Sequence, residues 1–369
     1  MSPAQSPSPS HSWRWRYGKY AIALITLLLV LSAAKPPRRL LKAKRRAAHA
    51  PRSEIAAPPW SPPALDPALA RCIRDSSPRY RAFIDAQRDV RKPPGGTLCN
   101  QCISRLFLTW GQVVAHNPSL NPLEVLDIGG NRGATALAFL EAFPAPTVVR
   151  SFEMDPTTCA MLRASHDSLS NAADRARWHV TCEGVAAERG AKEFFSGGAG
   201  SPLSSLGRLN TLHENLRPGG LVNITTVVDI FERHDLAHVG FVKIDVEGWE
   251  REVIQGMDLA TNAPRIDALL FEHGETWIDT RKGPSSMSLA NVVEGLSEVG
   301  GGAGYACFLV GTFDLLPISP PWVAPIESDI VYAFNVLCLR RDAPIHRELL
   351  LSHRQELDHC LAGQGLWGY

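Results

Sequence analysis

The feature that most constrains the fold is an eleven-residue run, Leu123 to Gly133, which reads LEVLDIGGNRG. Its first half is apolar enough for a short buried strand of a parallel sheet, and residues 134–143 have the composition of a helix packed on that strand. The glycines at the join allow positive φ angles and close approach of the backbone to a ligand, while the first amides of the helix offer donors. The run therefore predicts a strand, a tight turn and a helix that together bind a polar ligand.

Strand-like and helix-like segments alternate along the chain after this run. The predicted strands of the main sheet are residues 123–128, 147–152, 178–182, 239–245, 266–272, 305–310 and 332–339. A further strand-like segment is 221–229, and helices are expected at 246–257, 288–299 and 347–361. This alternation predicts an α/β fold, in which a Rossmann-like, mostly parallel seven-stranded sheet carries helices on both faces.

The spacing of the acid and the glycines in the first turn separates the possible nucleotide ligands. A dinucleotide site favours G-x-G-x-x-G, whereas Asp127, Gly129 and Gly133 give D-x-G-x-x-x-G. That spacing is the one used for S-adenosylmethionine, which carries a sulfonium cation, an ammonium group and a ribose, and nearby acids suit those charges. Glu153 ends the second predicted strand, where a doubly wound fold places an acid for the ribose hydroxyls. Asp155, which precedes a proline, is instead expected to cap a helix.

The run FVKIDVEGWEREVIQGM, residues 241–257, resembles the signature of the FkbM family of S-adenosylmethionine-dependent methyltransferases, in which a strand ending in K-I-D-x-E-G leads into a helix. Other pieces occur in the family's order, namely DIGGNRG, the FE of FEMDP, Val228-Asp229, LLFEHGETW, Gly304-Tyr305 and NVLCLRR. The resemblance covers residues 123–341 and departs from the family where DIGGNRG and FEMDP replace the more usual DVGANIG and FEP. Trp249 replaces a usually small residue and is expected to narrow or line the substrate side.

The resemblance implies a class I methyltransferase fold and transfer of a methyl group to oxygen, commonly on sugars or hydroxylated natural products. The residues assigned to the cofactor are Asp127, Gly129, Gly130, Asn131, Gly133, Glu153 and Asp245. The catalytic candidates, all near carboxyl ends of predicted strands, are Asp245, Glu247, Glu272 and His273. Each has a structural alternative: Glu247 could stabilise a helix N-terminus, Lys243 could be a buried partner of Asp245, and His273 could be an ordinary core histidine.

The acceptor is the less constrained half of this hypothesis. A glycan or sugar hydroxyl is expected, with a lipid or quinone hydroxyl at a membrane surface as the alternative, and a membrane-tethered binding protein without turnover as the alternative of another class. No residue can be named the general base, and the sequence indicates no metal and no nucleic-acid partner. The lone C-x-x-C of Cys99 and Cys102 has no second pair to complete a zinc site, so an ordinary helix-entry turn, or a local disulfide in an oxidising lumen, is expected there.

Charge and cysteine usage divide the chain into a leader and a globule. The net charge is +1, but residues 1–60 contain eleven Lys or Arg and one acid, Glu54, so the remainder is acidic. Residues 1–19 are expected to be a disordered basic tail. The eight cysteines are scattered, several within apolar strands, and most are expected to be buried thiols, not a disulfide framework.

Residues 20–34 (YAIALITLLLVLSAA) form an uncharged apolar run flanked by aromatic residues, which favours a single-pass signal-anchor. A thin membrane is expected, because the fifteen residues of the run fall short of the roughly 20 that an average bilayer requires. A cleaved signal peptide, with Ser32, Ala33 and Ala34 near the cleavage point, and an organellar transit segment are the alternatives. Three positive residues precede the run and seven follow it closely, and this count places the globule in the cytoplasm. An arrangement typical of Golgi or endoplasmic reticulum enzymes places the globule in the lumen instead.

The remaining boundaries follow composition. Residues 35–66 are basic and then Pro-rich, as in an extended stalk, and the basic part suits anionic headgroups. Residues 67–122 are expected to be a helical extension, 123–343 the catalytic domain, and 344–369 a C-terminal helix and tail. Asn223-Ile224-Thr225 is a glycosylation sequon in a predicted buried strand, where we expect it to be unused.

Overall fold

The computed structural model describes residues 100–198, 201, 204–206, 216–274, 277, 288–299, 304–311, 314–319, 334–351 and 354–355. The predicted tail 1–19, membrane segment 20–34 and stalk 35–66 lie outside these residues, as does Cys99. Among the helices that are described, none combines the length and the apolar character needed to cross a membrane. The leader and its orientation therefore stay predictions.

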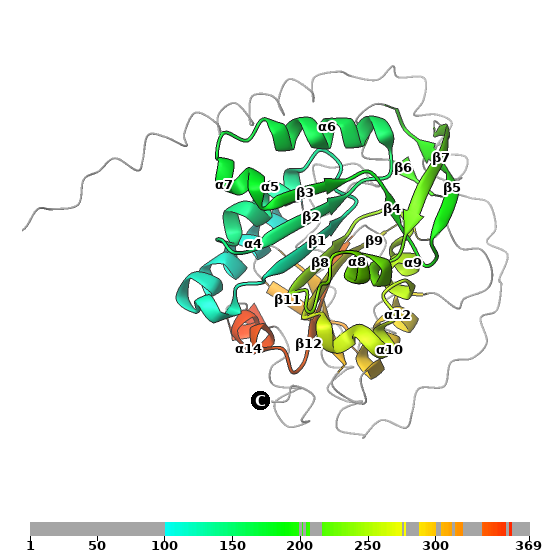
Figure 1. Cartoon of the computed structure of the whole chain (residues 1–369). Helices are drawn as coiled ribbons and strands as arrows, with labels where there is room; N and C mark the ends of the chain where they lie inside the picture. Colours follow the sequence, from blue (N-terminus) through cyan, green and yellow to red (C-terminus); the bar gives the residue numbers. More distant parts are fainter. Residues whose placement is uncertain are drawn as a thin grey trace, which may run out of the picture. The chain divides into compact units, whose positions relative to one another are not determined.

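The centre of the described fold is a nine-stranded sheet with the order β13-β11-β10-β12-β9-β8-β1-β2-β3 (Figure 1). Its strands are β1 Glu124–Ile128, β2 Val148–Phe152, β3 Trp178–Thr181, β8 Phe241–Ile244, β9 Ala268–His273, β10 Tyr305–Val310, β11 Asp314–Pro317, β12 Phe334–Arg340 and β13 Arg354–Gln355. The pairs β3-β2-β1-β8-β9 are parallel, and β12 runs antiparallel to both of its neighbours. The seven predicted strands and the mostly parallel sheet are confirmed, while β11 and β13 extend one edge beyond them.

The chain leaves β1 towards β2 on one side and later returns to place β8 on the other side of β1. In open α/β sheets the crevice at such a reversal, outside the carboxyl ends of the strands, is where ligands bind. The topology therefore directs attention to the segments that follow β1 and β8.

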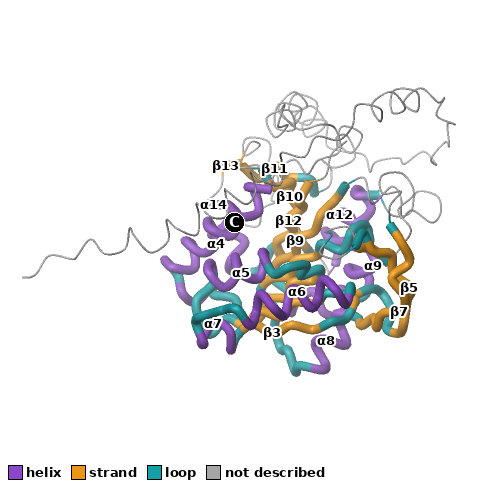
Figure 2. Tube along the Cα trace, turned by 90° about the horizontal axis from the view of Figure 1, so that it is seen from above, coloured by secondary structure: helices purple, strands orange, loops and turns teal. Residues whose placement is uncertain are grey.

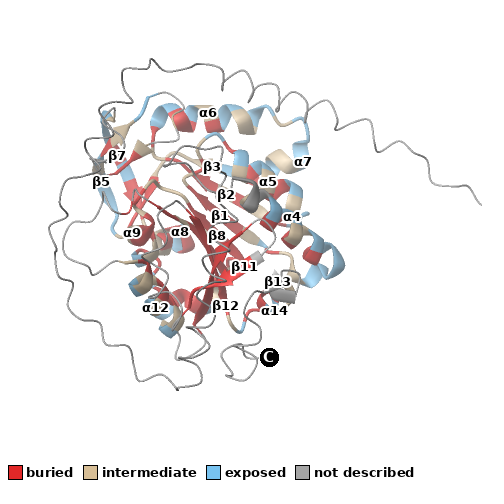
Figure 3. Cartoon of the chain, turned by 180° about the vertical axis from the view of Figure 1, so that it is seen from behind, coloured by how far each residue is buried: buried red, intermediate tan, exposed pale blue. Residues whose placement is uncertain are grey.

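Helices cover both faces of this sheet (Figure 2). They are α4 Asn100–His116, α5 Ala134–Ala142, α6 Pro156–Asp167, α7 Ala172–Ala176, α8 Val227–Arg233, α9 Glu250–Gln255, α10 Leu259–Asn262, α12 Leu289–Glu298 and α14 Pro344–Leu351, with short 3-10 turns at Pro118–Leu120 and Ala263–Arg265. One core cluster joins the sheet to α4, α5, α6 and α14, and a second joins it to α8, α9, α10 and α12. Neighbouring strand residues belong to opposite clusters, for example Phe241 and Val242, because successive side chains point to opposite faces. Both faces are thus buried, as the run of red strands in Figure 3 shows.

A second, four-stranded sheet of order β4-β7-β5-β6 is built from the span between β3 and α8. Its strands are β4 Gly184–Val185, β5 Gly190–Ser196, β6 Ser204–Ser205 and β7 Arg217–Thr225. A small apolar cluster that includes Phe194, Val222 and Ile224 packs against Met154 and Trp249 of the main fold. Of these strands, the sequence predicted only β7, because the other strands are short or contain few apolar residues.

Three predicted boundaries are wrong, each for a local reason. The strand predicted over 221–229 ends at Thr225, because the Thr226 side chain accepts from the Asp229 N–H and Asp229 accepts in return, which starts α8 with a capping box. The helix predicted over 246–257 shrinks to α9, since Glu247 and Gly248 have positive φ angles of 54° and 94° that a helix excludes. The helix predicted over 347–361 begins earlier, at Pro344, and ends at Leu351, before β13 pairs with β11.

The expectation of buried thiols is also wrong for the four cysteines whose side chains are described. Cys159 in α6 is bonded to Cys182 after β3, and Cys307 in β10 is bonded to Cys338 in β12. Cys307 and Cys338 lie directly opposite each other in the antiparallel register of those strands. Neither pairing could be read from spacing, because both depend on which strands become neighbours.

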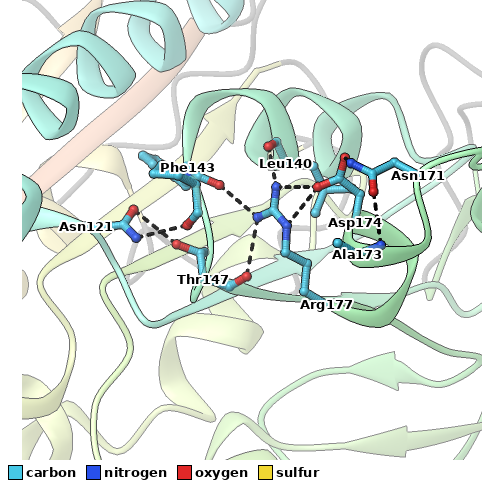
Figure 4. Close-up of polar contacts among 9 residues, drawn as sticks. Asn121, Leu140, Phe143, Thr147, Asn171, Ala173, Asp174 and Arg177 are labelled. Atoms are coloured by element: carbon cyan, nitrogen blue, oxygen red, sulfur yellow. Dashed lines mark hydrogen bonds and ion pairs between the residues drawn. The ribbon is translucent and has the colours of Figure 1, made fainter.

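Arg177, between α7 and β3, ties the helix after the glycine turn to the sheet (Figure 4). Its guanidinium donates to the backbone carbonyls of Leu140 and Phe143 at the end of α5 and to that of Thr147 before β2. It also pairs with Asp174, with Nη2 to Oδ1 at 2.8 Å. A half-buried cation at a helix C-terminus satisfies carbonyls that the helix itself leaves unpaired and opposes the negative end of its dipole.

We expect Arg177→Met to lower the free energy of unfolding by about 2–3 kcal/mol, because several buried carbonyls lose a charged donor. The matched control is Arg163→Met on the exposed face of α6, which should cost under about 0.5 kcal/mol. Urea titration of both variants measures the difference, and equal midpoints would contradict the role given to Arg177.

Candidate functional site

A cavity of about 480 Å³ opens at the carboxyl ends of β1, β2 and β8. It is lined by Ile128, Gly129, Gly130, Asn131, Arg132, Ala134, Thr135, Phe152, Glu153, Met154, Thr158, Glu183, Gly184, Val185, Ser201, Ser204, Leu206, Lys243, Asp245, Val246 and Glu247. The predicted residues Gly129, Gly130, Asn131 and Glu153 meet Asp245 and Glu247 there. Asp127, Gly133, Glu272 and His273 do not line the cavity.

The turn after β1 requires glycine for two separate reasons. Gly129 has a φ of 84°, and a Cβ at this position would lie 1.8 Å from the Asp245 carbonyl oxygen, so the β1 turn and the segment after β8 touch backbone to backbone. Gly133 has a φ of 89° and is pressed against the ring of Trp178, 2.6 Å from a Cβ placed there. The N–H groups of Gly129 and Gly130 both donate to the Phe152 carbonyl at 2.9 Å. The turn is thereby fixed between β8 and β2, with its open side towards the cavity.

Glu153 holds the same turn from the end of β2. Its Oε2 accepts from the Asn131 N–H and its Oε1 from the Asp155 N–H, both at 2.9 Å. Burial raises the pKa of Glu153, although these two N–H groups act in the opposite direction. Asn131 has a φ of 47°, and its buried Oδ1 has no hydrogen-bond partner within the described residues. The turn therefore presents an unpaired acceptor beside a carboxylate.

Asp155 performs the structural job predicted for it. Its Oδ1 accepts from the N–H groups of Thr157 and Thr158 and so caps α6. Its Oδ2 accepts from Ser196 at 2.7 Å and from Ser204 at 3.0 Å, which belong to the small sheet. The same carboxylate thus fixes α6 and one wall of the cavity.

Asp127 lies below the turn, fully buried. Its Oδ2 accepts from the Ser151 hydroxyl at 3.0 Å, and its Oδ1 lies 4.0 Å from the Lys243 ammonium. Burial raises the pKa of Asp127, and Lys243 opposes that rise. In this position Asp127 acts on the cavity through the turn and Lys243.

Acidic side chains gather where β8 and β9 end. Lys243 Nζ donates to Asp245 Oδ2 at 2.9 Å, which confirms the buried pairing considered from the sequence. Burial, followed by repulsion from Asp245, raises the pKa of Glu272 well above its ordinary value. The same two causes raise the pKa of Glu247. One buried cation therefore faces several carboxyl groups, and burial and mutual repulsion raise the pKa of Glu247 and of Glu272.

Glu250 is a fourth acid of this group that sequence reasoning missed. Its Oε1 accepts from the N–H groups of Val246 and Gly248, at 2.9 and 3.2 Å, and its Oε2 accepts from Trp277 Nε1 at 2.8 Å. It thereby holds the left-handed turn that presents Glu247 to the cavity. The E-x-x-E spacing of Glu247 and Glu250 was visible, but nothing in it indicated that the second acid turns back onto the first turn of its own helix.

His273 and Trp249 take positions away from the cavity wall. The His273 ring lies edge-on to Trp277, with centroids 4.8 Å apart. Trp249 packs against the small sheet, with the ammonium of Lys192 5.2 Å from its ring centroid. Trp249 was expected to narrow or line the substrate side. It is not among the residues that line this cavity, and it fastens the small sheet to the segment after β8.

Sequence reasoning also missed the wall that the small sheet contributes. Its described residues at the cavity are Gly184, Val185, Ser204 and Leu206. Ser205 Oγ donates to the Glu247 carbonyl at 2.9 Å, so this wall is bonded directly to the catalytic candidate. The Gly/Ser-rich composition of residues 196–206 was the available signal, and it indicated a loop without indicating where the loop lies.

The acid group predicts a pH dependence of stability. Burial raises the pKa of Glu250 from its ordinary 4.5 to about 7, although the Val246 N–H opposes the rise. The folded chain therefore binds this proton more tightly than the unfolded chain, and the resulting stability is complete below pH 4.5 and lost as the pH rises through about 7. We expect the fall in the free energy of unfolding across this window to be shallower in Glu250→Gln. Denaturant titrations at several pH values measure it, with the exposed Glu193→Gln, which should keep the wild-type slope, as the control.

Comparison with known proteins finds one family model that matches part of the chain. Residues 127–298 match the model of the methyltransferase FkbM domain. Among solved structures, a methyltransferase FkbM from Methylobacillus flagellatus is 12% identical with a TM-score of 0.37, over 74% of this chain and 55% of that one. An O-methyltransferase from Bacillus cereus in complex with SAH is 9% identical, TM-score 0.34, over 74% and 91% of the two chains. The O-methyltransferase TomG from Streptomyces achromogenes, in complex with SAM, is 11% identical, TM-score 0.33, over 75% and 90%.

The chain thus spans little more than half of the Methylobacillus protein. A comparison with curated proteins found no match. The assignment rests on the family model together with the glycine turn and the KIDVEG segment, both of which lie inside the matched range. Residues 127–298 are therefore similar to the methyltransferase FkbM domain.

Proposed function

We propose that this protein is a membrane-anchored, S-adenosylmethionine-dependent O-methyltransferase that acts on a sugar or glycan hydroxyl. The observation that carries the proposal is that one cavity joins the glycine turn and Glu153 to Asp245 and Glu247. The glycine turn and Glu153 suit a nucleoside cofactor, and Asp245 and Glu247 suit a hydroxyl that must lose its proton.

The residues of the cavity fit this cofactor. The unpaired Oδ1 of Asn131 is a buried acceptor for an ammonium or hydroxyl donor. Each carboxylate oxygen of Glu153 accepts one N–H, which leaves lone pairs for two ribose hydroxyls. The cluster of acids favours a cationic ligand. When bound, the cofactor supplies a methyl group on a sulfonium that a nucleophilic oxygen can attack.

The acids after β8 can receive the proton that the acceptor hydroxyl loses. Burial lowers the pKa of Lys243, but Asp245 and Asp127 outweigh it, so the pKa lies above its ordinary value and the ammonium stays charged beside Asp245. Glu247 lines the cavity, and burial and the charge of Asp245 raise its pKa, which makes its carboxylate a stronger proton acceptor than an ordinary one. Asp245 and Glu247 are therefore the candidates for positioning the hydroxyl and receiving its proton.

The acceptor class and the anchor are inferred from the sequence. The apolar run 20–34 provides the anchor, and the Pro-rich stalk 35–66 gives the domain reach towards an acceptor away from the bilayer, which favours a glycan over a lipid. The polar cavity wall, with Ser201 and Ser204 beside the acids, supplies hydrogen-bonding groups for sugar hydroxyls.

The test is methyl transfer by the full-length protein from labelled S-adenosylmethionine to a panel of glycans and hydroxylated lipids, with S-adenosylhomocysteine binding measured separately. Transfer to glycans supports the proposal. Transfer to lipids alone would replace the acceptor class, and absence of S-adenosylhomocysteine binding would overturn the cofactor assignment. Binding without transfer to any acceptor would favour a binding protein that keeps the fold.

We expect Glu153→Gln to weaken S-adenosylhomocysteine binding roughly tenfold, since an amide has one acceptor oxygen and cannot accept the ribose hydroxyls together with the N–H groups of Asn131 and Asp155 as a carboxylate does. Isothermal titration of the variant measures this loss. Glu141→Gln, on the exposed side of α5, is the control and should bind like the wild type.

We expect Asp245→Asn to lower kcat by roughly 100-fold or more while S-adenosylhomocysteine binding falls much less, because proton transfer depends on the carboxylate charge and S-adenosylhomocysteine lacks the sulfonium cation that this charge favours. Steady-state kinetics and titration on the same preparation separate the two effects. An unchanged kcat would show that Asp245 has no part in the chemistry.

A further inference from the structure

The sequon Asn223-Ile224-Thr225 has a different environment from the one its sequence suggests. It lies in β7 as expected, but Asn223 is exposed, while its neighbours Val222 and Ile224 are buried in the small cluster. Leu221, two residues earlier, is 75% exposed. Because alternate residues of a strand share a face, Asn223 belongs to an outward face of the small sheet.

Space for an attached group lies directly beside this asparagine. A shallow hollow of about 620 Å³ is lined by Glu183, Arg189, Gly190, Asn223, Ile224, Thr225, Asp229, Glu232 and Arg233. A Cβ added at Gly190, whose partner in the register is Ile224, would meet nothing within 4 Å. The rim carries charged groups of both signs, such as Arg233 and Asp229, which can bond to sugar hydroxyls. A first sugar on Asn223 would therefore enter a polar hollow without displacing packed side chains.

The cysteines give an independent indication of the environment. The four cysteines with described side chains form two disulfides, which join residues 23 and 31 positions apart. Disulfides persist in the lumen of the secretory pathway and outside the cell, and they are rare where glutathione and thioredoxin keep thiols reduced. The same compartment supplies N-glycosylation.

We infer that Asn223 carries an N-linked oligosaccharide and that the domain folds on the lumenal side of a secretory membrane. The Asn223 amide nitrogen displaces a lipid pyrophosphate from C1 of the sugar: a C–N bond forms, the C–O bond breaks, and the amide gives up one proton. Each cysteine pair loses two protons and two electrons to a disulfide donor, which is reduced to a dithiol. Oligosaccharide transfer occurs before folding, since Thr225 is buried and bonded to Arg233 in the finished fold.

This inference chooses between the two orientations that the leader allows. It places the domain in the lumen, whereas the count of three positive residues before the apolar run and seven after it favours the cytoplasm. That count is a bias and not a rule, and a cleaved signal peptide would place the domain on the same side. The inference is independent of methyl transfer, and its test does not use that activity.

The test expresses the full-length protein in cells with a secretory pathway and treats it with peptide N-glycosidase. We expect a mobility shift that is absent in Asn223→Gln and retained in Thr225→Ser, which preserves the sequon and the hydroxyl that Arg233 contacts. The matched control is Asn117→Gln: Asn117 is also exposed and lies in Asn-x-Ser, but Pro118 occupies the middle position and blocks modification. That variant should keep the shift.

A second measurement is alkylation of thiols in intact cells before and after reduction, which does not depend on any variant folding. Cys159, Cys182, Cys307 and Cys338 should react only after denaturation and reduction. No glycosidase shift in the wild type, or alkylation of these four cysteines after denaturation without reductant, would overturn the lumenal assignment. A shift that survives in Asn223→Gln would overturn the assignment of the site.

Discussion

The buried ammonium of Lys243 is the interaction on which the site depends. It lies 2.9 Å from Asp245 and 4.0 Å from Asp127, and so it links the two adjacent strands whose ends form the cavity. An isolated charge at this depth would be strongly unfavourable, and removal of one partner would leave the others uncompensated. The glycine turn fits only because β1 and β8 are held in this register, with Gly129 against the Asp245 carbonyl.

The number of acids around this single cation gives the site its electrostatic character. Burial and repulsion from Asp245 raise the pKa of Glu247 and of Glu272, so these two carboxyls ionise at a higher pH than isolated ones. A cation held in the cavity would favour the ionised forms. Binding of a positively charged cofactor would therefore leave more of these carboxyls deprotonated, and so able to accept a proton, at the time when the acceptor hydroxyl must lose one. This coupling explains why a group of acids, and not one carboxylate, lies beside the cavity.

The sequence determines the central part of this arrangement because the relevant signals are local. Apolar runs predicted all seven core strands, and the glycine spacing placed the turn, since both follow from side-chain burial and backbone sterics within a few residues. The disulfides, Glu250 and the small sheet were missed because each depends on contacts between distant segments. Cys307 meets Cys338 only through strand register, and the two-residue strands β4 and β6 have no pattern long enough to detect. The orientation of Asn223 was missed for the same reason, as burial of one strand face is set by what packs on it.

The small sheet is bonded to the segments that form the cavity. Asp155 bonds to Ser196 and Ser204, and Ser205 bonds to the Glu247 carbonyl. Trp249 anchors the sheet from the segment after β8, beneath Lys192. A shift of this sheet would move the Glu247 turn, which Glu250 holds from the other side. The small sheet and the proposed proton acceptor Glu247 are thus coupled through a turn of four residues, Val246 to Trp249, in which Glu247 and Gly248 have positive φ angles that admit few alternatives.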